Sequence, residues 1–178
     1  MIVISDTAPI ISFGKINKLS LLKELYHTVY LPTEVWEELI YPLTQNHSNI
    51  PEDIRLELDA KAAGWLIVKN PEKEESIELA LSLSQQLGLG ESYAIALSSE
   101  LSADLLLIND RKARDMAIEL GINTKWTTEV LIDAVSKKLI SSFDDFERIL
   151  NAMIDNGLWI EKDFYAKLLE EAKKKFKT

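Results

Sequence analysis

Two aspartates stand directly after short apolar runs and are the first candidates for chemistry. Asp6 comes shortly after the run 2–4, and Asp110 follows the run 105–108 with one residue between them. Such runs are typical of buried strands. If the two strands are parallel, both carboxylates emerge at the same edge of the sheet, where open α/β sheets bind ligands. Capping of the next helix is the alternative role for each aspartate.

Glutamates on two predicted helices could complete such a site. Glu91 opens a helix directly after a Gly-Leu-Gly segment and shares a face with Ala94 and Ser98, so its carboxylate is expected to point inward. The alternative is a first-turn acid stabilised by the helix dipole. On the helix that begins at Pro32, Glu37 and Glu38 flank the apolar stripe on opposite sides, and periodicity does not choose between them.

A cluster of these carboxylates predicts a site for a hard metal ion. Carboxylates that share a site repel one another and raise one another's pKa, and a bound cation relieves that repulsion. The chain has no cysteine, and its two histidines, His27 and His47, lack a partner at metal-ligand spacing, so both are expected to be structural or solvated. An all-oxygen ligand set favours Mg²⁺ or Mn²⁺ over zinc. The lack of cysteine also favours a reducing, cytoplasmic location.

Strands that alternate with helices predict the fold class. This alternation indicates an α/β protein, a three-layer α/β/α sandwich with a parallel, Rossmann-like sheet of about five strands. The strands are expected at 2–4, 28–31, 65–68, 105–108 and 124–127, and the longest loop at 43–49. Helices are expected at 10–25 with a break near Asn17, at 32–40, 52–63 and 71–88, from 90–91, after Asp110 up to a cap at Gly121, around 130–135, and at 143–156 and 162–175.

Length and charge limit the function classes. With 178 residues the chain is expected to form a single domain over 1–178. It carries 20 Lys and Arg against 29 Asp and Glu, a net charge of −9, so bulk charge cannot hold a nucleic acid. Such a partner would need a local basic patch or a bound metal. No apolar run approaches the roughly 20 residues that cross a bilayer, so no membrane role is expected.

Four segments together resemble a known family. They are Val-Ile-Ser-Asp6-Thr-Ala-Pro, Leu-Pro-Thr-Glu-Val-Trp-Glu-Glu38-Leu, Gly-Leu-Gly-Glu91-Ser-Tyr-Ala-Ile-Ala and Leu-Leu-Ile-Asn-Asp110-Arg-Lys-Ala-Arg. In order and context they resemble the motifs of PIN-domain ribonucleases. The resemblance spans a core of about 2–140, followed by a helical extension of about 141–178. The tail segment Gly-Leu-Trp-Ile at 157–160 is similar to the small prokaryotic PIN-like branch that includes toxins of toxin–antitoxin pairs.

The resemblance implies a function and a set of site residues. Asp6, Glu38, Glu91 and Asp110 would be the catalytic acids and would hold Mg²⁺ or Mn²⁺, while Thr7 would support the substrate or the metal. The implied activity is metal-dependent endoribonuclease cleavage of RNA, in a cytoplasmic toxin that forms a homodimer and is blocked by a small antitoxin protein. Relatives of this branch often carry an acid where Asn109 stands, so either Asp110 is the ligand or one ligand has been lost.

Substrate contacts are expected beside Asp110. Asn109, Arg111, Lys112 and Arg114 are the candidate substrate-binding residues, and Lys15, Lys18 and Lys125 are secondary candidates; ordinary solvated helix charge is the alternative. The four tryptophans, Trp36, Trp65, Trp126 and Trp159, lie in or beside predicted packed elements. They are therefore expected in the core and not as platforms for base stacking. An apolar face at Phe143, Phe146, Leu150 and Met153 either closes the domain or forms a dimer or antitoxin surface.

Two other functions compete with the nuclease. A catalytically idle PIN-like module that binds a protein or RNA partner is favoured by the amide at Asn109. A phosphatase of the haloacid-dehalogenase type also begins with a strand followed by an aspartate. That chemistry requires a second aspartate two residues later, where this chain has Ala8, which argues against it.

Overall fold

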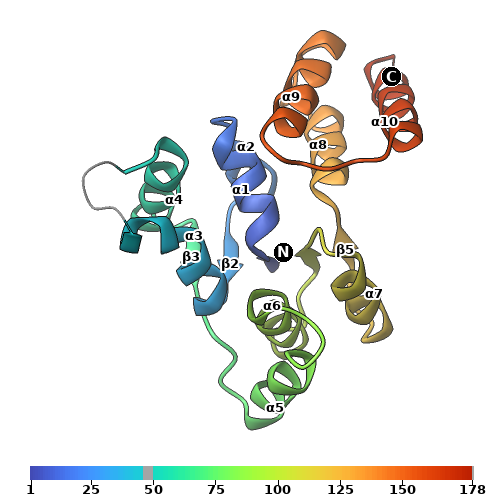
Figure 1. The fold of residues 1–178 in the computed structure, drawn as a ribbon. Helices are drawn as coiled ribbons and strands as arrows, with labels where there is room; N and C mark the ends of the chain where they lie inside the picture. Colours follow the sequence, from blue (N-terminus) through green and yellow to red (C-terminus); the bar gives the residue numbers. More distant parts are fainter. Residues whose placement is uncertain (46–49, 178) are drawn as a thin grey trace.

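The chain is built around five short parallel strands (Figure 1). The computed structural model describes residues 1–45 and 50–177. The strands are β1 (Val3–Ser5), β2 (Val29–Leu31), β3 (Leu66–Val68), β4 (Leu105–Leu107) and β5 (Thr124–Lys125). They lie in the order β3-β2-β1-β4-β5, and every neighbouring pair is parallel. The predicted parallel sheet of five strands is confirmed.

Helices cover both faces of this sheet. They are α1 (Thr7–Lys15), α2 (Ser20–Tyr26), α3 (Thr33–Gln45), α4 (Glu52–Ala62), α5 (Glu74–Leu83), α6 (Leu89–Glu100), α7 (Arg111–Glu119), α8 (Thr127–Ser136), α9 (Phe143–Asp155) and α10 (Lys162–Phe176). Successive strand side chains enter opposite cores: Val3 joins the core that contains α1, α8, α9 and α10, and Ile4 joins the core under α6 and α7. The three-layer α/β/α architecture is therefore confirmed. None of the helices in the described part of the chain has the length and apolarity needed to cross a membrane.

The strand order creates a switch point at the centre of the sheet. From β1 the chain builds outward through β2 to β3, then crosses to β4 on the other side of β1. Ser5 pairs with Leu107, so β1 and β4 end at the same level. The loops after these two strands diverge in opposite directions, which opens a crevice at their carboxyl ends. Asp6 follows β1, and Asn109 and Asp110 follow β4, so all three lie at this crevice.

The two C-terminal helices extend the larger core. Phe146, Leu150 and Met153 of α9 are almost fully buried, as is Leu168 of α10, and both helices contact α8. The apolar face of α9 thus packs within the chain and is not a free surface for a partner. Of the two roles that the sequence left open for this face, the structure supports closure of the domain.

Several predicted boundaries differ from the structure. Helix α3 continues through Pro42 to Gln45, whereas the prediction ended it at Ile40. Proline removes one backbone donor, but this turn is exposed, so water can satisfy the freed carbonyl. Helix α5 begins at Glu74 and not at 71–72, because the Glu100 carboxylate accepts hydrogen bonds from the backbone N–H groups just before it. Residues 46–49 of the predicted loop, including His47, lie outside the described residues.

Other local features differ in their details or agree. The last strand is shorter than predicted: it ends at Lys125, because Trp126 is the N-cap residue of α8 and that helix begins at Thr127. The spacing of Ala113, Met116, Ala117 and Leu120 predicts a buried stripe on α7. Leu120 is nevertheless 48% exposed, because the helix ends at Glu119 and the chain turns away at Gly121. The predicted break at Asn17 is present, with φ of +54°.

Candidate active site at the carboxyl edge of the sheet

Asp6 is the buried centre of the candidate site. It joins β1 to α1, its backbone N–H donates to the carbonyl of Leu107 at 3.0 Å, and the residue is only 3% exposed. Its Oδ1 is buried and has no hydrogen-bond partner among the described residues. A buried carboxylate oxygen without a donor is costly, so this position favours either a proton or a cation.

The surroundings of Asp6 shift its titration. Burial raises the pKa of Asp6 well above its ordinary value, and the nearby Glu91 carboxylate raises it further. Hydrogen bonds from the backbone of Asn109 and Ala8 oppose the rise, and Glu38 adds to it. Two carboxylates thus act on a third in a poorly solvated place, which is the electrostatic pattern of a site that a cation would stabilise.

Glu38 reaches the site from α3 and is held by Thr7. The Thr7 hydroxyl donates a hydrogen bond to Glu38 Oε2 with 2.6 Å between the oxygens. A Cβ built on Gly90 would lie 3.3 Å from the same Glu38 oxygen and 3.5 Å from Thr7 Oγ1. Glycine therefore lets the start of α6 approach these two side chains closely. Of the two glutamates that periodicity left open, Glu38 is the one that contacts Thr7.

Glu91 lies in the first turn of α6 and folds back over the segment before it. A Cβ built on Gly88 would lie 2.3 Å from Glu91 Oε2, so any larger residue there would displace the carboxylate. Ala94, Ile95 and Ser98 on the same helix are buried, as predicted, while Glu91 itself is half-buried. The sequence marked this Gly-Leu-Gly segment only as a helix start. Its role in giving two carboxylates room became visible in the structure.

Asn109 and Asp110 have different roles at the end of β4. The half-buried Asn109 contributes a backbone hydrogen bond to Asp6, and its side-chain Oδ1 accepts from the Thr127 N–H at 2.9 Å and from the Thr127 hydroxyl at 3.0 Å. Asp110 is exposed and caps α7 by accepting a hydrogen bond from the Ala113 N–H at 2.7 Å. Asn109 thus ties β4 and α8 to the acidic centre, while Asp110 performs the capping role weighed as its alternative.

The basic residues after Asp110 divide by their partners. Arg114 donates to Thr124 Oγ1 at 3.0 Å, pairs with Glu129 at 3.4 Å, and stacks over the Trp126 ring at 4.6 Å. Lys112 donates to the Gln86 carbonyl at 3.1 Å. Arg111 is exposed at the first position of α7. Arg114 is therefore held by contacts within the protein, and Arg111 is the basic residue of this group that is best placed to contact a ligand.

The lysines named as secondary candidates also separate. Lys125 forms an ion pair and hydrogen bond with Asp133, whereas Lys15 lies at the end of α1 with its Nζ 3.5 Å from the Asn156 carbonyl. Lys18 is exposed in the turn before α2. His27 ends α2 with φ of +65°, a backbone role that agrees with the structural interpretation of this histidine.

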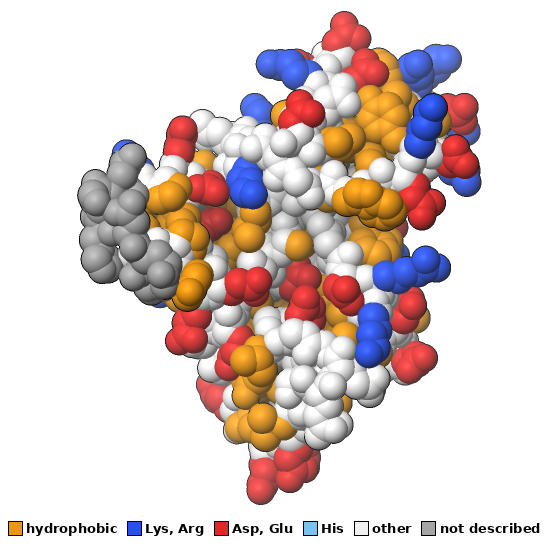
Figure 2. Space-filling view, viewed as in Figure 1, with side chains coloured by type: hydrophobic (Ala, Val, Ile, Leu, Met, Phe, Trp, Pro, Cys, Tyr) orange, Lys and Arg blue, Asp and Glu red, His pale blue; other side chains and the backbone are white. Residues whose placement is uncertain are grey.

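A groove runs from the acidic centre toward the C-terminal helices. Its volume is about 810 Å³, and it lies between α1, α8 and the connection 156–161, with Asn109 and Arg111 at one end. We call this cavity the α1–α8 groove. Figure 2 shows acidic side chains gathered at the centre of this face and hydrophobic ones above them, over the connection between α9 and α10. The groove thus leads from the acidic centre to a part of the surface with fewer acidic side chains.

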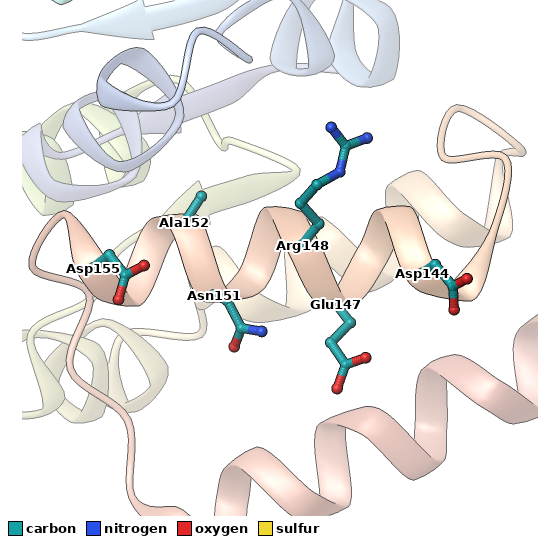
Figure 3. Close-up of a pocket in the computed structure, with 6 residues that line it drawn as sticks. All are labelled: Asp144, Glu147, Arg148, Asn151, Ala152 and Asp155. Carbon is teal, nitrogen blue, oxygen red and sulfur yellow. The ribbon is translucent and has the colours of Figure 1, made fainter.

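A second depression lies on α9, away from the acidic centre (Figure 3). Glu147 and Asn151 point toward α10, where Tyr165 donates a hydrogen bond to Asn151 at 2.9 Å, and Arg148 points the other way. Its lining consists of Asp144, Glu147, Arg148, Asn151, Ala152 and Asp155. It contains none of the residues that the sequence singled out, so the α1–α8 groove is the cavity connected with the site.

The oxygen donors suit a hard cation better than any other ligand class. Asp6, Glu38 and Glu91 come from three separate elements, and the unpartnered Asp6 oxygen is the strongest single sign. As the side chains are placed, no three acidic or histidine residues within 1–45 and 50–177 converge closely enough to form a ready ligand cage. Glu38 instead bonds Thr7, and Glu91 folds over Gly88, so both side chains would have to turn toward an incoming ion.

The fold and the acidic centre define an α/β protein with its ligand site at the switch point of a parallel sheet. A model of the PIN-domain family matches residues 2–174, and this chain belongs to that family, as the sequence motifs indicated. A comparison with curated proteins gives no match. PIN domains are in general nucleases and typically use divalent metals, which makes hydrolysis of nucleic-acid phosphodiesters the general class of activity.

Proposed function

We propose that this chain is a Mg²⁺- or Mn²⁺-dependent endoribonuclease. The observation that carries the proposal is the buried Asp6 carboxylate, which has one oxygen without a partner among the described residues and two further carboxylates acting on it. Family membership supports the nuclease class. The groove that leads away from Asp6 supports a polymeric substrate, because the nucleotides on either side of the cleaved bond need a protein surface to bind.

Asp6, Glu38 and Glu91 would hold the divalent ion, with Asn109 beside them. When bound, such an ion lowers the pKa of water and offsets the charge that develops on a phosphodiester undergoing hydrolysis. The chain's own residues would orient the reactants. The Thr7 hydroxyl donates a hydrogen bond to Glu38, and Asn109 keeps the N-terminus of α8 against the site through Thr127.

Asp110 enters the proposal in a different way. It caps α7 and is exposed, so we propose that it acts from the rim of the site, by contacting the ion through water or by maintaining α7 beside the substrate. Arg111, the next residue along the chain, would then contact a phosphate of the RNA backbone. In this arrangement Lys112 and Arg114 mainly stabilise the fold around the site and do not bind phosphate, because both already hydrogen-bond other residues of the chain.

A catalytically idle PIN-like module is the second candidate. The observation that favours it is the amide side chain of Asn109, a residue after β4 whose backbone hydrogen-bonds Asp6, combined with the capping bond of Asp110. Titration calorimetry with Mn²⁺ distinguishes the two, because a module that has lost its site shows no saturable binding of the ion.

The toxin role is a finer part of the same proposal. We infer from the resemblance of the sequence motifs that the protein acts in the cytoplasm, as a homodimer whose acidic centre is blocked by a small antitoxin protein. Native purification should then recover a small partner, and overexpression without it should arrest growth. Recovery of the chain alone, together with harmless overexpression, would contradict this part and leave the nuclease proposal intact.

The test of the nuclease is cleavage of a panel of single-stranded and structured RNAs with Mg²⁺, Mn²⁺ or chelator. We expect cleavage that needs the ion and that falls by at least about 100-fold in Asp6→Asn. The matched control is Asp115→Asn, the same change at an exposed aspartate of α7, which should cut at the parental rate. Parental cleavage by Asp6→Asn would show that the proposed centre is wrong.

A further inference from the structure

Trp159 is the least expected side chain on this face of the molecule. It lies in the connection between α9 and α10, lines the α1–α8 groove and is 79% exposed. The sequence placed all four tryptophans in the core, and Trp36 and Trp65 are indeed buried there. For Trp159 that prediction is wrong, because burial alternates along this connection: Leu158 and Ile160 are half-buried, and Trp159 between them is exposed.

The neighbours of Trp159 hold it in this exposed position. Leu158 and Ile160 pack against the core, so the residue between them must point away from it. Gly157, at φ of +105°, makes the turn that brings the segment off α9, and the Leu158 N–H donates to the Met153 carbonyl at 2.9 Å. A large aromatic ring is thus presented to solvent by an anchored segment, at the edge of a groove.

The same groove carries a local excess of positive charge. Lys15 and Arg111 line it against a single acid, Glu161, in a chain whose net charge is −9. Lys15 reaches across from α1 toward the Asn156 carbonyl, and Arg111 lies at the start of α7. Aromatic faces combined with cations along a groove are the arrangement by which proteins bind single-stranded nucleic acid.

The groove also leads directly to the acidic centre. Ala8 and Asn109 line it, and the backbone of both residues hydrogen-bonds Asp6. A ligand in the groove therefore lies next to the carboxylate that the proposed reaction uses. Its volume of about 810 Å³ suits a short stretch of an extended polymer.

We propose that the α1–α8 groove binds single-stranded RNA, with one nucleobase stacked on Trp159 and the backbone phosphates contacted by Lys15 and Arg111. The assignment rests on the proposed ribonuclease function, since it names the form in which the substrate reaches Asp6. Stacking on a protein ring requires an unpaired, splayed base, which a single strand offers and a continuous duplex does not. Regions of the substrate that are paired therefore lie outside the groove.

The experiment measures binding separately from cleavage. The Asp6→Asn protein, in which cleavage is expected to be lost, is titrated with a fluorescein-labelled 12-nucleotide RNA in Mg²⁺, either single-stranded or annealed to its complement. In this background Trp159→Ala should weaken binding of the single strand by about 5- to 150-fold, the loss expected for one base stack. Trp159→Phe retains an aromatic face and should stay within about threefold of the parent. Leu81→Ala, at a 53% exposed residue of α5 outside the groove, should have no effect.

Charge variants complete the test. Lys15→Gln and Arg111→Gln should each reduce the slope of log affinity against log salt by about 0.7, whereas Lys23→Gln, at an exposed lysine of α2, should leave it unchanged. Unchanged binding by Trp159→Ala overturns the proposal. So does equal dependence of duplex binding on Trp159, or a copurified protein whose binding, and not that of RNA, requires this residue.

The two proposals fail in distinguishable ways. Metal-dependent cleavage by the parental protein that is as fast in Trp159→Ala as in the parent, with RNA binding unchanged, rejects the groove and keeps the nuclease. Binding of the single strand that depends on Trp159, with no cleavage in any metal, rejects the nuclease and keeps the groove. The second pattern would identify an RNA-binding PIN module.

Discussion

Replacing Glu57 by glutamine should change how the stability of this protein depends on pH. Glu57 lies on α4 where that helix packs against α1, is 2% exposed, and has an Oε2 without a partner in the described part of the chain. A Cβ built on Gly14 of α1 would lie 3.4 Å from its other oxygen. Burial, and then the charge of Asp53, raise the pKa of Glu57 from 4.5 to about 8.

The direction of the effect follows from proton linkage. Below pH 4.5 the folded and unfolded chains both hold this proton, and the titration of Glu57 does not affect stability. Between pH 4.5 and 8 the folded chain retains a proton that the unfolded chain has released, so the free energy of unfolding falls as the pH rises. The slope is about 1.4 kcal/mol per pH unit, and the whole loss is roughly 5 kcal/mol once the pH exceeds the folded-state value.

Glu57→Gln removes this titration while keeping the shape of the side chain. The assay is urea denaturation at pH 5.5, 6.5 and 7.5 for the parent, Glu57→Gln and Asp59→Asn, an exposed control on the same helix. Titration of every other group is common to the proteins and cancels in the differences. We expect the advantage of Glu57→Gln to grow by about 1.4 kcal/mol per pH unit, and that of the control to stay constant. Parallel pH dependence of Glu57→Gln and the parent would show that Glu57 has no raised pKa in the folded chain.

Two further predictions concern residues around the site. Gly88→Ala should lower cleavage about as much as Glu91→Gln while the thermal midpoint stays within a few degrees, because the new methyl group displaces only the flexible Glu91 carboxylate; a fully active variant in the RNA cleavage assay would contradict this. Arg114→Gln should cost about 1–2 kcal/mol of unfolding free energy, through lost contacts with Thr124, Glu129 and Trp126, without altering RNA affinity. Weaker RNA binding at unchanged stability would instead make Arg114 a phosphate contact.

The order and type of the elements could be predicted from local patterns. Short apolar runs marked the first four strands, and Gly121 marked a helix end that the structure shows with positive φ. Parallel pairing followed from the alternation of strands and helices, because a parallel strand needs a crossover to return. That pairing also placed Asp6 and the end of β4 at one edge. The motifs around Asp6, Glu38, Glu91 and Asp110 then indicated the family that the match over 2–174 confirms.

Local patterns were insufficient wherever a side chain's role depends on distant neighbours. Asn109 and Asp110 are adjacent in sequence, yet one is joined to Asp6 and Thr127 and the other caps α7. Periodicity left Glu37 and Glu38 equivalent until the Thr7 hydroxyl distinguished them. In each pair, the role of the side chain depends on which distant residues it meets in the folded chain, and composition and spacing do not contain that information.

Local patterns in the chain were enough to predict the α/β class, the parallel sheet and the set of acids from which a site could be built. The tertiary structure decided which of those acids meet, that Glu57 is buried without a compensating charge, and that Trp159 faces a groove and not the core. The physical reason is the range of the interactions. Hydrophobic periodicity and turn preferences act within a few residues, whereas burial and electrostatic coupling arise only when segments far apart in the chain pack together.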